Sequence, residues 1–157
     1  MAGSYLKVFL DRYPDINIRI LLKNENIDLT QGDVAICPLI PHQPHLIQKY
    51  LYTARIKLFA SQSYLNKFGI PQTIDDLHHH RLIIYRGNYY TTYGSTNWLL
   101  NLGIQNGQAP RKSYFEIDSL NGMLNSALQG YGIVELPDMS LILNSGLKEI
   151  LPEITGP

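Results

Sequence analysis

The stretch Ser119–Pro137, SLNGMLNSALQGYGIVELP, determines the fold class. Its first half carries one continuous apolar stripe at helical spacing, at positions 120, 123, 124, 127 and 128. Gly130 can end this helix, and Gly132–Leu136 then forms a short apolar strand that Pro137 interrupts. A helix that leads directly into a buried strand is the repeating element of an α/β domain.

The same alternation extends toward the N-terminus. Leu6, Phe9, Leu10 and Tyr13 follow the spacing of a helix face, and Pro14 ends that helix. Alternating or continuous apolar residues predict strands at residues 16–20, 34–37, 46–52 and 56–60.

Residues 61–151 continue the pattern. Ser63 is expected to cap a short helix that Gly69 closes, and Thr73 with Asp76 resembles a capping box for a second one. A third short helix is expected at 139–144, and residues 86–97 form a polar loop. Extended segments are predicted at 82–85, 98–102, 111–117 and 147–151, with a tight hairpin turn at 106–107. The whole chain therefore predicts an α/β fold with mainly parallel strands.

The composition excludes several classes of protein. Among 157 residues, 45% are hydrophobic and 17% charged, which is typical of a globular domain, and 13 basic residues balance 13 acidic ones. Direct nucleic-acid binding is not expected, because it normally needs a basic excess. Cys37 is the only cysteine, which rules out an intramolecular disulfide. The sequence shows neither a membrane-spanning apolar run nor a secretory signal, so we predict a cytoplasmic protein without membrane contact.

No pattern of residues predicts catalysis, a metal or a cofactor. Gly130-Tyr131-Gly132 follows a helix and precedes a strand, the reverse of a dinucleotide-binding loop. Neither a phosphate-binding P-loop nor a G-x-S-x-G nucleophile motif is present. The five histidines, at positions 42, 45 and 78–80, lack a recognisable zinc-ligand spacing. We therefore expect no enzyme, no bound metal and no cofactor.

Several short motifs occur together in a specific order. They are FLDRYPDI (9–16), DL followed by GDVAI (28–36), ASQSYL (60–65), GIP (69–71), ALQGYGI followed by LP (127–137), and GL followed by LP (146–152). In this order and spacing, the chain resembles the effector-binding domain of LysR-type transcriptional regulators over nearly its whole length.

The resemblance implies a fold like a type 2 periplasmic binding protein, with two α/β lobes and an effector-binding cleft between them. Residues 1–60 would form part of the first lobe, 61–151 the second lobe, and 152–157 a C-terminal tail. The first lobe is expected to be incomplete in this chain, because its first strand and the second crossing strand are missing from the pattern.

The resemblance also implies a function. The domain would bind a small effector, with an organic acid the favoured class, and thereby control DNA binding by a helix-turn-helix domain that this chain lacks. Family members of this kind form homodimers, so a homodimer is expected. The alternative is a solute-binding protein of a transport system, which shares the fold but normally carries an export signal.

The favoured anion site is the start of the helix at Ser119 and Leu120. Free backbone N–H groups and the helix dipole at this point favour a carboxylate. The alternative interpretation is that Ser119 only caps the helix, since every helix start offers such donors.

By resemblance, Cys37 and Pro38 end a first-lobe strand facing the cleft, where many related regulators carry an arginine in place of Cys37. Cys37 could sense redox state, or it could be a buried apolar residue. Ser61 lies where the chain enters the second lobe, and its hydroxyl could bind the effector or cap a turn.

Three further residues complete the predicted effector site. Tyr85 and Arg86 end a strand, and Arg86 could pair with a carboxylate or be a solvated surface side chain. Glu135 lies within a strand, where a buried carboxylate could have a functional role.

Overall fold

The computed structural model describes residues 2–21, 32–37, 42, 45–86 and 97–156. Pro38, the Asp28-Leu29 motif and most of the predicted loop at 86–97 lie outside these residues. The chain divides into two compact units, Met1–Ala35 and Ile36–Pro157, and each is described by itself.

The first unit contains the predicted N-terminal helix. Helix α1 spans Ala2–Arg12, and the backbone N–H of Tyr13 still donates to the carbonyl of Phe9 at 3.0 Å just before Pro14. Residues 16–20 form no strand, although they are described, and their three isoleucines are exposed. The prediction of a strand was wrong here because alternation alone does not supply the neighbouring strand that a ladder needs.

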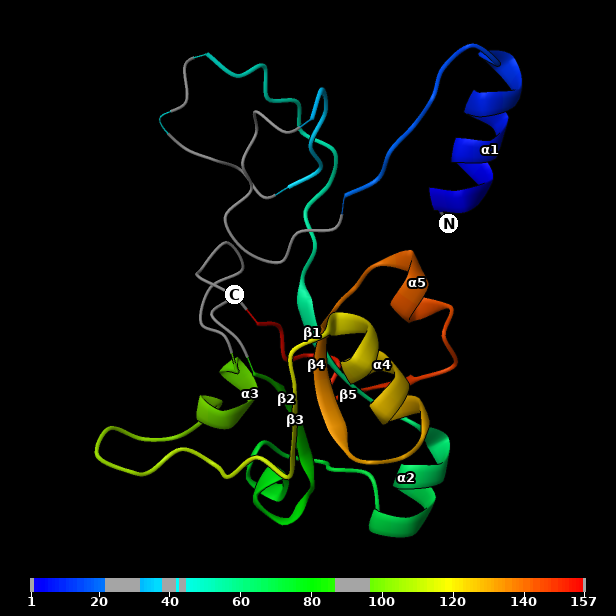
Figure 1. The fold of residues 1–157 in the computed structure, drawn as a ribbon. Helices are drawn as coiled ribbons and strands as arrows, with labels where there is room; N and C mark the ends of the chain where they lie inside the picture. Colours follow the sequence, from blue (N-terminus) through cyan, green and yellow to red (C-terminus); the bar gives the residue numbers. More distant parts are fainter. Residues whose placement is uncertain (1, 22–31, 38–41, 43–44, 87–96, 157) are drawn as a thin grey trace. The chain divides into compact units, whose positions relative to one another are not determined.

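The second unit is built on a five-stranded mixed sheet with the order β3-β2-β4-β1-β5 (Figure 1). Strand β2 pairs in parallel with both β3 and β4, whereas β1 pairs antiparallel with β4 and β5. The expectation of mainly parallel strands therefore holds only for the β3-β2-β4 part of the sheet. The strands are β1 (Ile56–Ala60), β2 (Leu82–Tyr85), β3 (Phe115–Ile117), β4 (Ile133–Pro137) and β5 (Lys148–Ile150).

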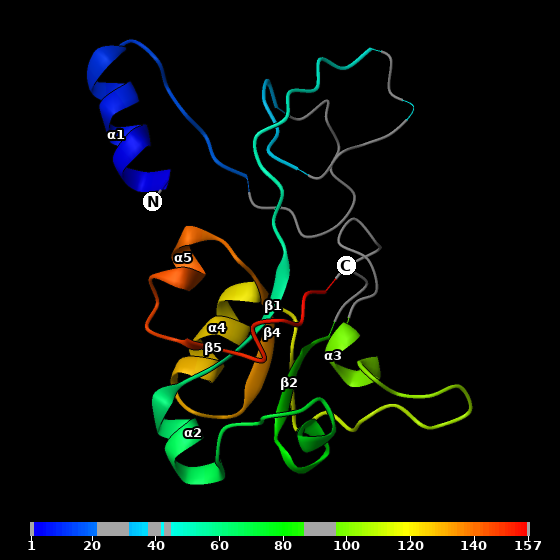
Figure 2. The ribbon, with the colours of Figure 1, turned by 180° about the vertical axis from the view of Figure 1, so that it is seen from behind.

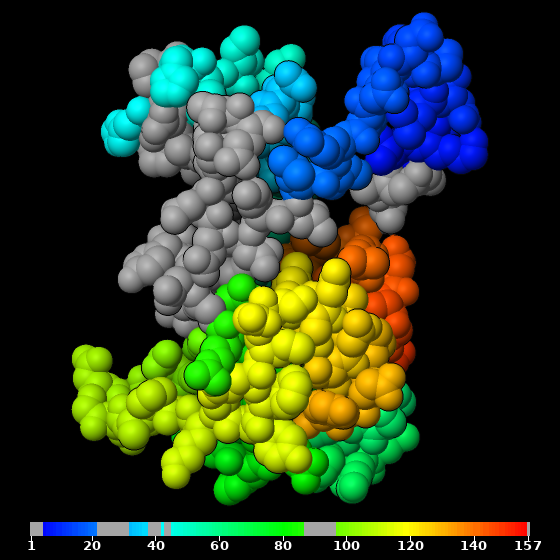
Figure 3. All heavy atoms as spheres, viewed as in Figure 1, coloured from blue at the N-terminus to red at the C-terminus, as the bar shows by residue number. Residues whose placement is uncertain are grey.

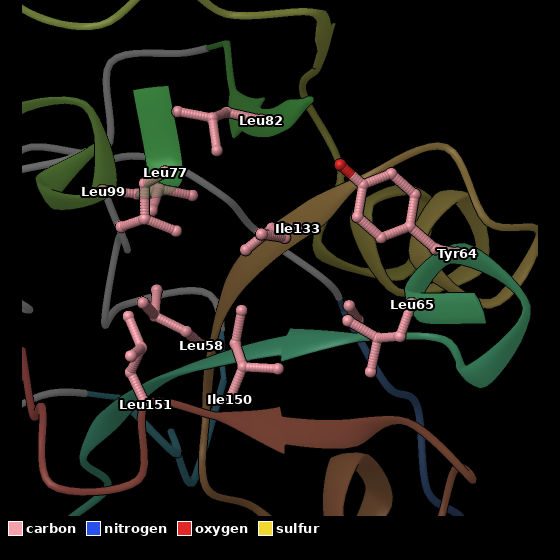
Figure 4. Packing of buried hydrophobic residues seen from close by; sticks show 10 residues of the cluster. Leu58, Tyr64, Leu65, Leu77, Leu82, Leu99, Ile133, Ile150 and Leu151 are labelled. Carbon is pink, nitrogen blue, oxygen red and sulfur yellow. The ribbon is translucent and has the colours of Figure 1, made fainter. Parts of the chain in front are cut away.

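Among the described residues, five helices accompany this sheet, and apolar side chains cover both of its faces. Leu58 and Ile133 belong to one cluster, which also takes side chains from α2, η2 and α3 (Figure 4). Phe59 and Val134, their neighbours along the strands, belong to the other cluster with residues of α4 and α5. Helix α4 lies beside β4 in both Figures 1 and 2. The helices are α2 (Gln62–Phe68), the 3-10 helix η2 (Asp75–His79), α3 (Trp98–Asn101), α4 (Leu120–Leu128) and α5 (Ser140–Leu143).

Two predicted strands of the N-terminal third are absent from the sheet. Residues 34–37 and 46–52 are described but form no strand, and Val34 and Ile47 are 87% and 91% exposed. Their apolar sequences resemble buried strands, but they pair with none of the described strands.

Three local predictions also need correction. Residues 98–101 form helix α3 instead of a strand, because a short apolar run fits either structure and only its neighbours decide between them. Asn106-Gly107 forms a turn but no hairpin, since the following strand β3 pairs in parallel with β2. The cap of α2 is Ser61 and not Ser63: the Ser61 hydroxyl accepts from the N–H of Tyr64 at 3.3 Å.

Gly132 sets the approach of β4 to β2. A Cβ atom at this position would lie 2.3 Å from the carbonyl oxygen of Arg81, the residue before β2, which accepts a hydrogen bond from Ile133 N–H at 2.8 Å. The obstacle is backbone, so it cannot rotate away as a side chain could. The glycine is therefore required by the close pairing of the two central strands.

We predict that Gly132→Ala lowers the free energy of unfolding by about 1–3 kcal/mol, because β4 must shift away from Arg81 to admit the methyl group. Urea unfolding followed by circular dichroism measures this change. Gly32→Ala is the matched control, because its nearest obstacle is 3.8 Å away. Equal stability of the two variants would contradict this account of the β2–β4 pairing.

Candidate functional site

The three parallel strands end at the same edge of the sheet. Tyr85 pairs with Ile117, and Arg86 N–H donates to the Ile117 carbonyl at 2.9 Å. The register Ile83↔Val134 brings the end of β4 to this edge as well. We call it the carboxyl-end edge and define it by Tyr85–Arg86, Ile117–Leu120 and Leu136–Pro137. The space beyond the carboxyl ends of parallel strands is where α/β proteins usually bind ligands.

Helix α4 begins at this edge, immediately after β3. The Ser119 hydroxyl accepts from the N–H of Gly122 at 3.2 Å, and the Ser119 carbonyl accepts from the N–H of Met123 at 2.8 Å. Within the described part of the chain, the N–H groups of Leu120 and Asn121 have no protein acceptor. Ser119 therefore caps the helix, as the alternative interpretation expects. Two further backbone donors at the positive end of the helix dipole remain for an anion.

Gly122 fixes the position of this helix start. A Cβ atom here would lie 2.3 Å from Cδ1 of Ile117, the last residue of β3. The first turn of α4 therefore rests directly on the end of the strand. Helix α4, coloured yellow to gold, forms part of the surface seen in Figure 3. Leu120 in its first turn is 41% exposed. A glycine within a helix interior is the sequence signal that could have indicated this close contact.

Asn97, which the sequence analysis did not select, holds the end of β2. Its side-chain oxygen accepts from the N–H of Tyr85 at 3.1 Å, and its side-chain nitrogen donates to the Tyr85 carbonyl at 3.0 Å. Arg86 is exposed, and its Nε lies 4.0 Å from Oε2 of Glu116. An exposed ion pair at this distance is weak, so the Arg86 guanidinium remains able to pair with another anion.

Glu135 is half-buried and caps helix α3. Its Oε2 accepts from the N–H of Leu99 at 2.7 Å. Burial raises the pKa of Glu135 above its ordinary value, although hydrogen bonds from the backbone of Leu99, Asn97 and Trp98 act in the opposite direction. The carboxylate is thus engaged at the positive end of a short helix, which accounts for its presence in an apolar environment.

Arg111 is buried at the other end of α3. The sequence did not predict it as a site residue. Its guanidinium donates to the carbonyls of Leu99, Leu102 and Ile74 at 3.4, 2.5 and 3.1 Å. Burial lowers the pKa of Arg111, whereas the charge of Asp75 raises it. Helix α3 therefore lies between a carboxylate at its N-terminus and a guanidinium at its C-terminal carbonyls. The sequence alone could not reveal this, because the residues are far apart in the chain.

Ser61 is not brought to the carboxyl-end edge, whereas the prediction for Cys37 stays untested. Ser61 follows Ala60, which pairs with Lys148 at the opposite end of β1 from Ile56↔Pro137. It is buried, and its hydroxyl also lies 3.0 Å from the hydroxyl of Ser63. Cys37 is half-buried in a segment outside the sheet, and its thiol has no hydrogen bond to a described residue. The structure thus brings four of the predicted residues together at the carboxyl-end edge: Tyr85, Arg86, Ser119 and Leu120. Glu135 instead lies at the start of α3.

Among the described residues, no group of three His, Cys, Asp or Glu side chains could hold a metal ion. Among the same residues, no helix is both long enough and apolar enough to cross a bilayer.

The family model described as LysR substrate binding domain matches residues 3–154. The chain belongs to this family. Because nearly the whole chain is matched, the resemblance inferred from its short motifs is confirmed, and so is its assignment to the ligand-sensing regulatory part of LysR-type regulators. The alternative of a transport solute-binding protein is not favoured.

Relatives of this LysR substrate-binding domain are transcriptional regulators. An uncharacterized HTH-type transcriptional regulator of Haemophilus influenzae is 31% identical over 153 residues, which are 94% of this chain and 52% of that protein. The HTH-type transcriptional regulator CrgA of Neisseria meningitidis serogroup B is 28% identical over 132 residues, 83% of this chain and 42% of that protein. The chain therefore spans about half the length of these relatives or less.

Solved structures agree with the family and confirm the predicted α/β fold of the type 2 periplasmic-binding-protein kind. The regulatory domain of AphB in Vibrio vulnificus matches with a TM-score of 0.72 and 25% identity, over 100% of this chain and 79% of that one. The regulatory domain of CrgA, a LysR-type regulator from Neisseria meningitidis, gives a TM-score of 0.72 at 23% identity over the same share of each chain, which shows the fold alone. The division into lobes at residue 60 stays a prediction.

We predict that Glu135→Gln flattens the pH dependence of stability. The folded-state pKa lies above the ordinary value of 4.5, so the free energy of unfolding of the wild type falls as the pH rises from there through the folded pKa. An amide cannot ionise, yet its oxygen can still accept from the N–H of Leu99. The variant should therefore be at least as stable as the wild type at about pH 7.

Urea unfolding at several values from about pH 4 to about pH 8 measures this effect. Glu153→Gln removes the same charge from an exposed position and is the control. An unchanged dependence of stability on pH in Glu135→Gln, or a large loss of stability at neutral pH, would show that ionisation of Glu135 does not destabilise the folded state.

Proposed function

We propose that this domain senses a small carboxylate effector at the carboxyl-end edge of its sheet. The start of α4 would bind the carboxylate through the N–H groups of Leu120 and Asn121, and Arg86 would add a positive charge. Tyr85 would border the ligand. The observation that carries the proposal is that a helix N-terminus with two unused donors opens at the common end of three parallel strands.

In the whole regulator, effector binding would control a helix-turn-helix domain that lies outside this chain. A ligand changes the balance between two states of a protein only through its different affinity for each. The proposed regulator is a cytoplasmic homodimer that binds DNA through that other domain and catalyses no reaction. Its relationship to HTH-type transcriptional regulators supports this assignment.

The proposed carboxylate site does not include Cys37, Pro38 or Ser61. Ser61 lies away from the helix start that supplies the donors, Cys37 makes no described hydrogen bond, and Pro38 lies outside the described residues. The hydroxyl of Ser61 is already engaged as the cap of α2. Glu135 would act indirectly, by holding α3 against the sheet.

The proposal predicts a saturable rise in melting temperature with one class of small carboxylates. A thermal-shift screen should cover aliphatic and aromatic carboxylates, with amino acids and nucleotides as other classes. A ligand at a hundredfold excess over its Kd adds about 2.7 kcal/mol to the stability of the folded state. A cooperative melt that no carboxylate shifts would contradict binding by this chain.

Arg86→Gln should weaken the binding of the active carboxylate about tenfold, because it removes a charge-assisted partner from the edge. Lys148→Gln removes the same charge from an exposed position on β5 and should leave the affinity unchanged. An equal effect of both variants would indicate nonspecific attraction by net charge instead of a site at the carboxyl-end edge.

A further inference from the structure

A hollow lies at the end of the parallel strands opposite the carboxyl-end edge. It has a volume of about 450 Å³ and forms where β2 begins at Leu82, next to Tyr114, which precedes β3. The carboxyl-end edge lies three residues further along β2, at Tyr85. At about 3.3 Å per residue, the two places are separated by roughly 10 Å. The hollow is therefore distinct from the proposed effector site.

Basic groups dominate the lining of this hollow. Arg81, Arg111 and Lys112 contribute three cations, and His78 and His80 lie beside them. No aspartate or glutamate is among the residues that line it. The sequence has no net charge, so this one-sided lining is a local feature and not a consequence of composition.

Arg81 is held between two aromatic rings. Its guanidinium carbon lies 4.7 Å from the ring centre of Phe68 and 4.4 Å from that of Tyr114. Stacking fixes the plane of the guanidinium through its faces and leaves the N–H groups at its rim available for hydrogen bonds. Within the described part of the chain, the Arg81 side chain has no hydrogen bond and no carboxylate partner. It is a pre-oriented donor without an acceptor.

Asp75 and Asp76 act on Arg111 and His80, two residues of the lining, but neither carboxylate is unengaged. Asp76 accepts from the backbone N–H groups of Gln72 and Thr73 at 2.8 and 2.9 Å. Asp75 acts on Arg111, which is already bound to three backbone carbonyls. Neither carboxylate lines the hollow, so the charges of Arg81 and Lys112 are not neutralised there.

Arg111 adds a second donor without a partner. It is 7% exposed, and its Nε–H has no acceptor among the described residues. A buried donor normally has a partner, because leaving it unpaired costs about 1–3 kcal/mol. Because this Nε atom is itself buried, Arg111 contributes positive charge to the hollow, whereas Arg81 supplies the unused side-chain donors.

We propose that this hollow binds a small dianion, either a phosphate group or a dicarboxylate. Arg81 would donate to it from the rim of its stacked guanidinium, and Lys112 would approach from the exposed side. The Ser113 hydroxyl donates to Glu116 at 2.6 Å and is not required. A ligand here would bind independently of one at the start of α4.

Isothermal titration calorimetry at low salt tests this, with inorganic phosphate and succinate as separate probes. We expect saturable binding of at least one probe, and the stronger binder identifies the chemistry of the natural ligand. Arg81→Gln should weaken that binding about tenfold, and Lys112→Gln about threefold. Lys148→Gln removes the same charge elsewhere and should leave it unchanged.

Two results would overturn the proposal. One is the lack of saturable binding of both probes to the wild-type chain. The other is binding that Arg86→Gln weakens while Lys112→Gln does not, since that would place the anion at the carboxyl-end edge. If Arg81→Gln does not fold after losing its stacking contacts, Lys112→Gln still decides, because Lys112 is exposed.

Discussion

The parallel pairing of β2 with both β3 and β4 is the constraint on which the rest of the site depends. Parallel neighbours end at the same edge, so the residues that follow them meet although they are distant in sequence. This brings Arg86 after β2 to Ser119 after β3. Close backbone contact maintains the arrangement: Gly132 lets β4 approach Arg81, and Gly122 lets α4 rest on Ile117.

Two opposite charges, one half-buried and one buried, complete this arrangement on one face of the sheet. Helix α3 has only four residues, too few to be stable by itself. Glu135 satisfies a backbone donor at its start, and Arg111 satisfies carbonyls at its end. These charges match the helix dipole, and together they place Leu99 in the apolar cluster shown in Figure 4. The cost of burying each charge is offset by the backbone groups that it satisfies.

The sequence predicted best those elements that local residues determine. The stripe of α4, its cap at Ser119 and the strand at Leu82–Tyr85 were correct because periodicity and capping are local signals. The strands expected at 34–37 and 46–52 were wrong because burial on a sheet depends on partners that no local pattern supplies.

The same distinction applies to the candidate site. Arg86, Ser119 and Leu120 could be selected because each follows directly from a predicted strand or helix end. Asn97 and Arg111 could not, since their roles arise from residues that only the fold brings near. Gly122 carried a local signal, a glycine inside a helix, but its contact with Ile117 is visible only in the fold. Ser61 was selected by resemblance, and the register of β1 places it at the far end of the sheet.

The central claim is that an anionic effector binds at the start of α4. Amide chemical-shift mapping by NMR, during titration with the carboxylate that raises the melting temperature, tests it most directly. The account predicts saturable shifts of the Leu120, Asn121 and Arg86 amides, with little change at Arg81 and Lys112. Shifts that are confined to other residues and leave the start of α4 unaffected would contradict it.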